Sequence, residues 1–538
     1  MTEETKELFW ADQLAKEILS RKTFHYIDRE VPKQDEYTVK TSASISGVLH
    51  IGRLSDTIRG SSVVKALRDA KANVRFIWVA EDMDPLRKVP QGVPDSFAEY
   101  IGMPVTDIPD PDGCHSSYAA HHVAEYFKVI DDFVHGELEK FSMREEYKKG
   151  SFNPFIKKIL ENVGTVIEIQ NRYRSNPLAA GWSPWTPICK ECRKISTPRI
   201  ISIKNGKVEY ECKDYNFETT IAKGCGYNGE NDPMKDEGKL MWKSEWAAQW
   251  SRWKVSSEGA GKEYQVPNSA FWINGEIVEK VLDWPMPKPI FYEHLFVDDV
   301  KMSASLGNVV YPKDWLQVAS PQLLRFLYNK RLMKTRSLSW KELSQLYDEY
   351  DHAGKVAFEM ATEENEKEKA QLKRLHEMSN FERSEEPLEM SFSYACVLVQ
   401  TYEDDSEAIR AALKKTGHYQ PMLDEKIFER IEKAKAWLSL YAPQDVKFSV
   451  QKSVSASLKL TEKEIKALKL LAEKLREKQF TEKELSMEFY ETAKAVGITA
   501  KELYKAGYLV LLNQEKGPRL ANFLLVLGDR AIKLFESL

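Results

Sequence analysis

The stretch "YTVKTSASISGVLHIGRLSDTIRGSSVVKALRDAKANVRFIWVAEDMD", residues 37–84, decides the fold. Residues 37–44 predict a strand that runs into a loop of small residues, and residues 51–69 carry apolar residues at helical spacing. Residues 73–84 predict a second strand, which ends in acids. Strand, helix and strand form a βαβ unit, so we expect an α/β fold with a parallel sheet and helices on its faces.

The composition of the 538-residue chain, with 42% apolar and 30% charged residues, is that of a globular protein. The net charge of -4 gives no overall attraction to nucleic acid, so any RNA contact must come from a local patch. No apolar run reaches the ~18 residues of a transmembrane helix, and "MTEETKELFW" at the start lacks the features of a signal peptide. Six cysteines are too few for a disulfide scaffold, so we expect a cytoplasmic enzyme without a membrane partner.

The rest of the chain departs from the alternation of strands and helices. Residues 105–235 are rich in turns and hold most of the cysteines, so they predict an insertion, and strand-like runs return near 270–300. After about residue 320 the pattern becomes almost wholly helical. The basic run 451–483 predicts either a solvated helix face or a phosphate-binding stripe. The aromatic residues near it either stack on unpaired bases or belong to the core: Trp437, Tyr441 and Tyr504.

Small residues ahead of the first predicted helix point to a phosphate site. After Ser44 and Gly47 the backbone N–H groups of the helix start face one point, and a helix N-terminus attracts phosphate. His50 would stand at the mouth of that helix as a donor, and Gly52 would let a base or ribose approach the backbone. By itself the string predicts a plain turn with a surface histidine equally well.

A second string, "KMSASLGN" at 301–308, makes the phosphate-site prediction from the first string more specific. It carries Lys301 on a Ser/Gly-rich loop, where the ammonium can neutralise the β- and γ-phosphates while Ser303 and Ser305 donate hydrogen bonds. Alone, the string predicts an ordinary basic loop. The two strings, in this order and at opposite ends of an interrupted βαβ domain, together favour an ATP site.

In this pairing "HIGR" (50–53) resembles the HIGH-type signature of class I aminoacyl-tRNA synthetases, and "KMSAS" (301–305) resembles their KMSKS-type loop. The resemblance implies a Rossmann-type sheet split by a connective insertion, and activation of an amino acid by ATP with Mg²⁺. It implies catalytic roles for His50, Lys301 and Ser303. The residues implied to bind ATP are Gly47, His50, Gly52, Lys301, Met302, Ser303 and Ser305.

Four longer strings are similar to the archaeal-type class I lysyl-tRNA synthetases: residues 81–122, 393–400, 441–449 and 516–524. The resemblance implies that the protein forms lysyl-adenylate and transfers lysine to the terminal adenosine of tRNA(Lys). We expect a monomer, although the sequence does not give the oligomeric state. It also implies five segments: the first half of the Rossmann catalytic domain (1–104), a connective insertion with zinc sites (105–235), the second half (236–320), a helical stem-contact domain (321–388) and an α-helical anticodon-binding domain (389–538).

The implied amino-acid site contains both matches and departures from the family. Its residues are Ser42, Ser44, Asp82, Trp242 and Tyr264. Trp242 matches the family, whereas Ser42 and Ser44 replace a Gly and a Thr, and Tyr264 follows Glu263 where the family has His after Asp. A lysine site needs a carboxylate for the ε-ammonium and a ring over the alkyl stem. The candidate carboxylates are Glu81, Asp82, Asp84 and Glu245.

Two alternatives to lysine activation follow from these departures. One is a paralogue that uses another amino acid or acceptor, because buried polar groups discriminate strongly between ligands. The other is a relative that binds tRNA without catalysis, which the intact His50, Gly52, Lys301 and Ser303 disfavour.

Cysteine spacing predicts a metal centre in the insertion. Cys189 and Cys192 form a C-x2-C knuckle, and Cys212 with Cys225 would complete a four-cysteine structural Zn²⁺ site; free thiols are the alternative.

"DPDGCHSSYAAHH" (110–122) predicts a second zinc site from mixed ligands, which the family resemblance also implies. The ligands would be Asp110, Cys114, His115 and His121, with His122 as the alternative to His121. A helix start with exposed histidines explains the same string without a metal.

Overall fold

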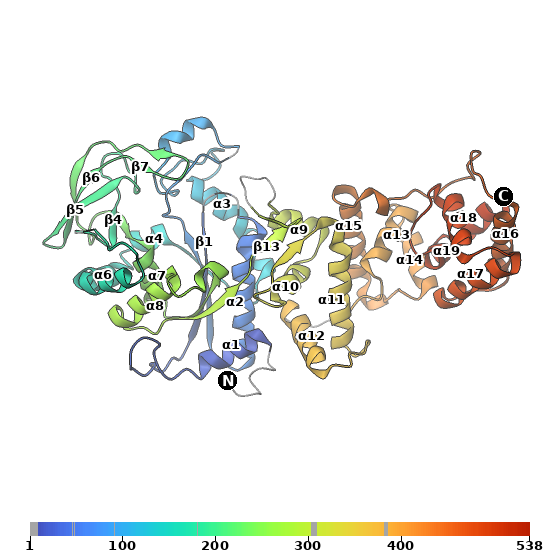
Figure 1. Ribbon diagram of the computed structural model, residues 1–538, viewed down its shortest axis with the longest axis horizontal. Coiled ribbons are helices and arrows are strands. Elements are labelled where there is room, and N and C mark those ends of the chain that lie inside the picture. The colour runs from blue at the N-terminus through green and yellow to red at the C-terminus, as the bar shows by residue number, and fades with distance from the viewer. Residues whose placement is uncertain are drawn as a thin grey trace. The chain divides into compact units, whose positions relative to one another are not determined.

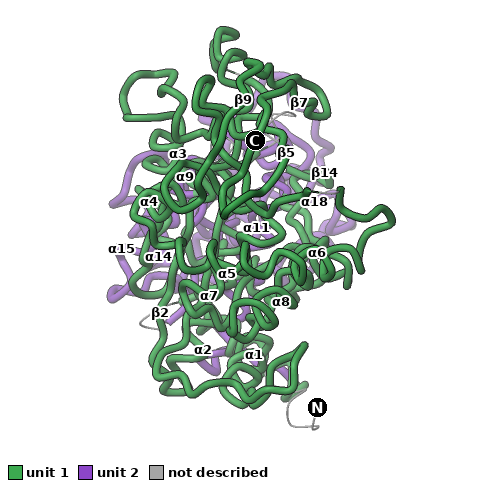
Figure 2. Tube along the Cα trace, turned by 90° about the vertical axis from the view of Figure 1, so that its left-hand side faces the viewer, with its two compact units in different colours: residues 1–315, 320–338, 364–384 green, residues 316–319, 339–363, 385–538 purple. Residues whose placement is uncertain are grey.

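The computed structural model describes residues 9–45, 47, 49–90, 92–179, 181–302, 309–380 and 386–538. The chain divides into two compact units (Figure 2). The first comprises residues 1–315, 320–338 and 364–384, and the second comprises residues 316–319, 339–363 and 385–538. Within the described ranges, no helix combines the length and the apolar character that crossing a membrane requires.

A five-stranded parallel sheet forms the centre of the first unit (Figure 1). Its strands are β1 (Tyr37–Ser44), β2 (Val74–Glu81), β3 (Glu139–Ser142), β11 (Val255–Gly261) and β12 (Lys288–Tyr292). Their order is β12-β11-β1-β2-β3, so the chain moves outward from β1 in both directions. In such a sheet, ligands bind at the carboxyl ends of the strands where the order reverses, here between β1 and β11. The predicted Rossmann-type parallel sheet is confirmed.

The opening βαβ unit folds as its pattern predicts. β1 and β2 pair without a register break, from Tyr37 opposite Val74 to Ser44 opposite Glu81. Helix α2 (Ile51–Asp69) joins them, and most of its residues are buried, since α1 (Trp10–Leu19) and α10 (Pro321–Asn329) also pack on it. A helix covered on several sides has no polar face, which explains why Asp56 and Arg59 are buried within it.

Two segments differ from the expectation. Residues 270–281, near which strand-like runs were expected, form helix α8 (Ala270–Val281), so that expectation is wrong for them. The β-prone aromatic and branched residues of α8 pack against α7 (Trp242–Arg252), and this packing overrides local propensity. Strand β3 lies within 105–235 and yet belongs to the central sheet. It has only four residues, all half-buried, and therefore no sequence periodicity to detect.

Between β3 and α7 the chain forms small sheets and short helices. Two of the sheets, β5-β6-β9 and β10-β4, are antiparallel. The elements in and around this region are α3 (Tyr118–Phe127), α4 (Met143–Lys148), α5 (Asn153–Glu161), α6 (Val163–Arg172), β4 (Trp185–Pro187), β5 (Pro198–Lys204), β6 (Lys207–Cys212), β7 (Tyr215–Asn216), β8 (Ile221–Ala222), β9 (Asn228–Asn231) and β10 (Gly238–Leu240). The five predicted domain boundaries stay predictions.

After β12 the first unit adds a small three-stranded sheet in the order β14-β13-β15 and further helices. These elements are β13 (Leu295–Val297), β14 (Val300–Lys301), α9 (Pro312–Val318), β15 (Arg336–Leu338) and α12 (Glu366–Ser379).

The second unit is built from helices, which confirms the largely helical C-terminal pattern. They are α11 (Leu343–Ala357), α13 (Phe392–Tyr402), α14 (Ser406–Thr416), α15 (Asp424–Leu440), α16 (Glu462–Glu477), α17 (Glu482–Val496), α18 (Ala500–Leu512), α19 (Leu520–Leu527) and α20 (Asp529–Glu536). Three of them, α16, α17 and α18, begin with the same capping box, in which a threonine and the glutamate three residues later satisfy each other's backbone N–H.

For three aromatic residues the sequence allowed either base stacking or a place in the core, and the structure places them differently. Trp437 is buried and donates its indole N–H to the Trp340 carbonyl at 2.6 Å, so it belongs to the core. Tyr441 stacks on Trp340, with ring centroids 4.3 Å apart. Tyr504 is half-buried and lies against Phe489. In the basic run, Lys474, Lys478 and Arg476 pair with glutamates, which favours the solvated helix face for this part of the run.

A buried carboxyl group in α2 faces the centre of the sheet. Ser42 N–H donates to Oδ2 of Asp56 at 3.3 Å, while Oδ1 has no hydrogen-bond partner among the described residues. Burial and the nearby Glu258 carboxylate raise the pKa of Asp56 to about 7. Because the raised pKa favours the protonated form in the folded state, its contribution to stability is complete at acid pH and is lost as pH rises toward 7.

We therefore expect Asp56→Asn to make unfolding less sensitive to pH. Between pH 5 and pH 8 the variant should gain stability relative to wild type, by roughly 1–3 kcal/mol at about 1.4 kcal/mol per pKa unit. Urea unfolding at the two pH values, followed by tryptophan fluorescence, measures this difference. Asp35→Asn, at a side chain that is 94% exposed, is the control. An unchanged pH dependence in Asp56→Asn would contradict the assignment.

Candidate active site and metal centres

The predicted nucleotide residues gather where β1 ends and α2 begins. The loop between them includes Gly47, whose φ of 147° favours glycine. His50 is the N-cap of α2, and its Nδ1 accepts the Gly52 N–H at 3.1 Å. With Nδ1 as acceptor, the proton of the neutral ring sits on Nε2. Burial, followed by the Arg53 charge, lowers the pKa of His50 to about 4, so the ring is a neutral Nε2–H donor near pH 7.

Gly52 is required by the position of the His50 ring. A Cβ at residue 52 would lie 2.7 Å from Cε1 and 2.8 Å from Nδ1 of His50, and 3.0 Å from Cε of Met302. The first two distances are far below van der Waals contact, so any side chain would displace the imidazole. The same measurement places Met302 of the second string beside the first string.

Residues on either side of the segment 303–308 contact the start of α2. Met302 lies next to Gly52, and the Val310 carbonyl accepts the Ile51 N–H at 2.8 Å. Lys301 pairs with Phe296 in the β13–β14 hairpin that leads to Met302. Ser303 and Ser305 lie outside the described residues, so their predicted contacts stay predictions. The fold thus brings together the two strings, which are about 250 residues apart in the sequence.

The predicted amino-acid residues do not all face one space. Ser44 donates its hydroxyl to Oδ2 of Asp84 at 3.1 Å. Asp82 instead accepts from the Ser142 hydroxyl at 2.5 Å and from Arg144 N–H at 2.9 Å, so both of its oxygens already have protein partners at the start of α4. Both oxygens of Asp84 also have protein partners, Ser44 and Lys239, but its side chain is 32% exposed whereas Asp82 is buried, so accessibility favours Asp84 over Asp82 as an acceptor for a ligand.

Aromatic rings border the same edge of the sheet. Trp242 stacks on Trp246 with centroids 4.7 Å apart, and Tyr264 meets the edge of Trp246 at 5.2 Å. Glu263, next to Tyr264, pairs with Nε2 of His294 at 3.1 Å. The hydrogen bond from His294 lowers the pKa of Glu263, and the Lys301 charge adds to this. Sequence reasoning did not identify His294, which lies between β12 and β13 and becomes part of the site only through the fold.

Lys239 is the second residue that sequence reasoning missed. It is buried in the middle of β10, with its ammonium 3.2 Å from Asp84 and 2.9 Å from Glu245. The only signal in the sequence is a lysine followed directly by Leu240, Met241 and Trp242.

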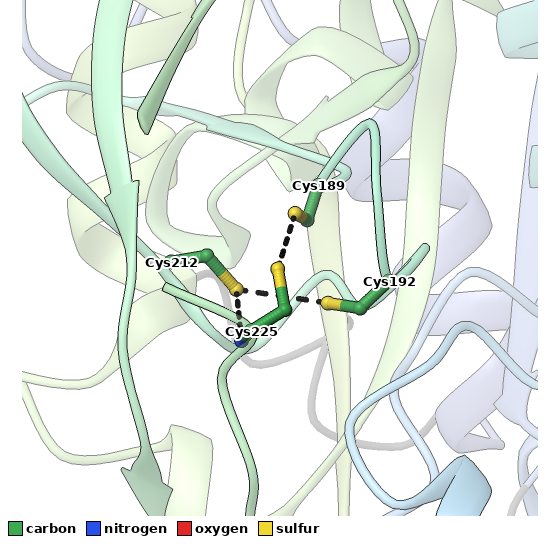
Figure 3. Close-up of side chains that lie close together, drawn as sticks. All are labelled: Cys189, Cys192, Cys212 and Cys225. Carbon is green, nitrogen blue, oxygen red and sulfur yellow. Dashed lines mark hydrogen bonds between the residues drawn. The ribbon is translucent and has the colours of Figure 1, made fainter. Parts of the chain in front are cut away.

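The four cysteines of the insertion converge on one point (Figure 3). The sulfur atoms of Cys189 and Cys225 are 3.7 Å apart and those of Cys192 and Cys212 are 3.6 Å apart. A disulfide requires about 2.05 Å, whereas tetrahedral Zn²⁺ with Zn–S bonds of ~2.3 Å places sulfur atoms ~3.8 Å apart. The residues therefore fit a four-thiolate zinc site with no open coordination position.

The second predicted metal group also assembles. One ligand atom from each of Asp110, Cys114, His115 and His121 lies within 4.8 Å of the others. Sγ of Cys114 is 3.0 Å from Nδ1 of His115 and 3.3 Å from Nδ1 of His121. The ring of the alternative ligand, His122, is buried against Tyr118. The mixed oxygen, sulfur and nitrogen donors suit Zn²⁺.

The sheet order, the paired signature strings and the cysteine cluster define a class I aminoacyl-tRNA synthetase. Residues 8–382 match the family described as tRNA synthetases class I (K), and the chain belongs to this family. A lysine–tRNA ligase of Methanocaldococcus jannaschii is 31% identical over 98% of this chain and 100% of its own length. The lysine–tRNA ligase of Thermococcus kodakarensis is 33% identical over 96% of this chain and 96% of its own length. That of Methanosphaera stadtmanae is 29% identical over 98% of this chain and 99% of its own length.

The Gly52 contact predicts the effect of one added methyl group. Gly52→Ala should displace the His50 ring and lower kcat/KM for ATP in ATP–pyrophosphate exchange by roughly 10- to 100-fold, as expected when one preorganised donor is misplaced. The matched control is Gly164→Ala in helix α6, where an added Cβ meets nothing within 4 Å. Equal kinetics in the two variants would contradict the role of Gly52.

The cysteine geometry predicts metal content. Cys212→Ala should lose about one equivalent of zinc per chain and lower the thermal midpoint, because a structural zinc site contributes folding energy. Elemental analysis of the purified protein measures the zinc. Cys396→Ala, at a buried cysteine of α13 outside both groups, controls for loss of a thiol. Full zinc occupancy in Cys212→Ala would rule out the four-cysteine site.

Proposed function

We propose that this protein activates lysine with ATP and transfers the lysyl group to the 3′-terminal adenosine of tRNA(Lys). The observation that carries the proposal is membership of the class I (K) synthetase family over residues 8–382, with end-to-end similarity to lysine–tRNA ligases. The placement of His50, Gly52 and Met302 at one helix start supports it. The proposed setting is the cytoplasm, where tRNA is used, and the proposed active species is a monomer.

In the first step the lysine carboxylate attacks the α-phosphate of ATP, bound as its Mg²⁺ complex, and pyrophosphate leaves. Negative charge builds on the phosphate oxygens, so preorganised donors speed the step. The neutral His50 ring offers its Nε2–H at the N-terminus of α2, where the helix dipole also favours an anion. Lys301, with Ser303 and Ser305, is assigned to the β- and γ-phosphates, and Gly47 to the loop under them.

The amino acid is assigned to the edge formed by Ser42, Ser44, Trp242 and Tyr264. Trp242 can cover the alkyl stem of lysine, and the partly exposed Asp84 can accept from its ammonium, whereas Asp82 is buried and held by Ser142 and Arg144. Zinc, bound by the four cysteines and by the Asp110 group, would stabilise the insertion. The second unit is assigned to tRNA, with the helical segment 389–538 reading the anticodon.

ATP–pyrophosphate exchange with each of the twenty amino acids tests the proposal. Exchange should require lysine, and His50→Ala should reduce its kcat by roughly 100-fold or more, as loss of one preorganised donor does. His352→Ala, at an exposed histidine of α11, should leave the rate unchanged.

The alternatives give different results in the same assay. Exchange with another amino acid and not with lysine would identify a paralogue of different specificity. A protein that binds tRNA but forms no aminoacyl-adenylate, with His50→Ala equal to wild type, would be a non-catalytic relative.

A further inference from the structure

A carboxylate pair beside the proposed amino-acid site is bridged by a lysine of the protein itself. The Lys239 ammonium donates to Oδ1 of Asp84 at 3.2 Å and lies 2.9 Å from Oε2 of Glu245. Three segments meet here: the loop after β2, strand β10 and the first turn of α7. Each acid has a second anchor, since Ser44 donates to Oδ2 of Asp84 at 3.1 Å and Tyr147 donates to Oε1 of Glu245 at 2.7 Å.

One oxygen in this cluster lacks an aligned donor. The Glu245 side chain is fully buried, and the partner of its Oε2 among the described residues is the Lys239 ammonium, which lies 2.9 Å away and poorly aligned for a hydrogen bond. The charge of Oε2 is balanced, but at least one of its two lone pairs has no donor. A buried acceptor without a donor is unfavourable unless a ligand supplies one. Asp84 is about a third exposed, with 32% of its side chain accessible, so a ligand can approach the pair from that side.

The cluster has a surplus of acids. Asp84, Glu245 and Glu81 interact with one another and share Lys239, while Lys40 is closest to Glu258, at 2.6 Å, and lies 3.9 Å from Glu81. Burial raises the pKa of Glu81 to about 8, so Glu81 is mostly protonated near pH 7. Asp84 and Glu245 then offer two carboxyl groups to the one ammonium of Lys239, so the cluster can pair with a single additional ammonium group.

We propose that Lys239 is a specificity-determining residue for the amino acid: its ammonium holds the Asp84 and Glu245 carboxyl groups in place, so that the pair accepts the ε-ammonium of substrate lysine as a second cation. The proposal rests on lysine being the substrate. Lys239 acts through the carboxylates as a positioning residue, and the ε-ammonium of the substrate donates the missing hydrogen bond to Oε2 of Glu245. A neutral side chain leaves that oxygen unsatisfied, and an anionic one meets the surplus charge, so both are rejected.

Without Lys239 the pair would lose its one cation. Burial raises the pKa of Glu245, and the Lys239 charge opposes that effect. In a variant without this cation the pKa of Glu245 would be higher still, which favours the neutral carboxylic acid. The preference for a cationic side chain would fall, because a charge-assisted hydrogen bond becomes an ordinary one.

Lys239→Met, which keeps an unbranched side chain close to the original length and removes its charge, tests this in ATP–pyrophosphate exchange. Lysine KM should rise roughly tenfold, and the ratio of kcat/KM for lysine to that for norleucine, which lacks the ammonium, should fall by about as much, with kcat within roughly threefold of wild type. Lys239→Arg should restore both values toward wild type. Lys235→Met, at a side chain that is 80% exposed, is the matched control.

Several results would overturn the inference. Unchanged lysine KM and unchanged selectivity in Lys239→Met would do so even if its thermal midpoint fell, because a purely structural role predicts that combination. If Lys239→Met does not fold, Tyr147→Phe replaces it, since removing the donor to Oε1 should raise lysine KM in the same direction; an unchanged KM there rejects the proposal. Absence of lysine exchange in the wild-type protein would instead refute the proposed function.

Discussion

The pairing of β1 with β11 is the contact on which the rest of the first unit depends. The two strands are separated by more than 200 residues, yet Thr38 pairs with Val255 and Lys40 with Glu258 in parallel. The fully buried Lys40 ammonium lies 2.6 Å from Glu258, and the Trp250 indole also donates to this carboxylate. A buried ion pair is strongly unfavourable with one partner missing, so it favours this register over its neighbours. The pairing places the ends of β1 and β11 side by side and creates the point where the sheet order reverses.

Everything assigned to chemistry lies at the carboxyl ends of that sheet. The His50 donor follows β1, the acids follow β2, and Glu263 and Tyr264 follow β11. The three-stranded sheet after β12 then brings Met302 to Gly52. Polar groups at this edge are paired in a chain that runs from the partly exposed Ser44 and Asp84 through Lys239 to the buried Glu245 and Tyr147. A network of this kind holds its members in one geometry, which suits a site that must recognise one side chain.

Sequence reasoning succeeded where the signal is local or lies in a matched string. The bounds of β1 and α2, the two signature strings, the four cysteines and the Asp110 group are all short patterns whose members are close in the chain or of rare type. It failed at α8, where β-prone residues form a helix because they pack on α7, and at β3, a four-residue strand with no periodicity. It also could not rank the acids, because Asp82 and Asp84 are two residues apart and differ only in which partners the fold brings to them.

The sequence by itself determined the class of fold and the family, and it singled out the two signature strings and both candidate metal groups, since each is a matter of residue type and spacing. Only the tertiary structure decided that Gly52 exists to make room for the His50 ring, that Asp82 caps α4, and that Lys239 joins Asp84 to Glu245. The physical reason is the same in each case. Contact, burial and charge balance depend on groups that are 2 to 155 residues apart in the chain, and no local pattern records which of them will meet.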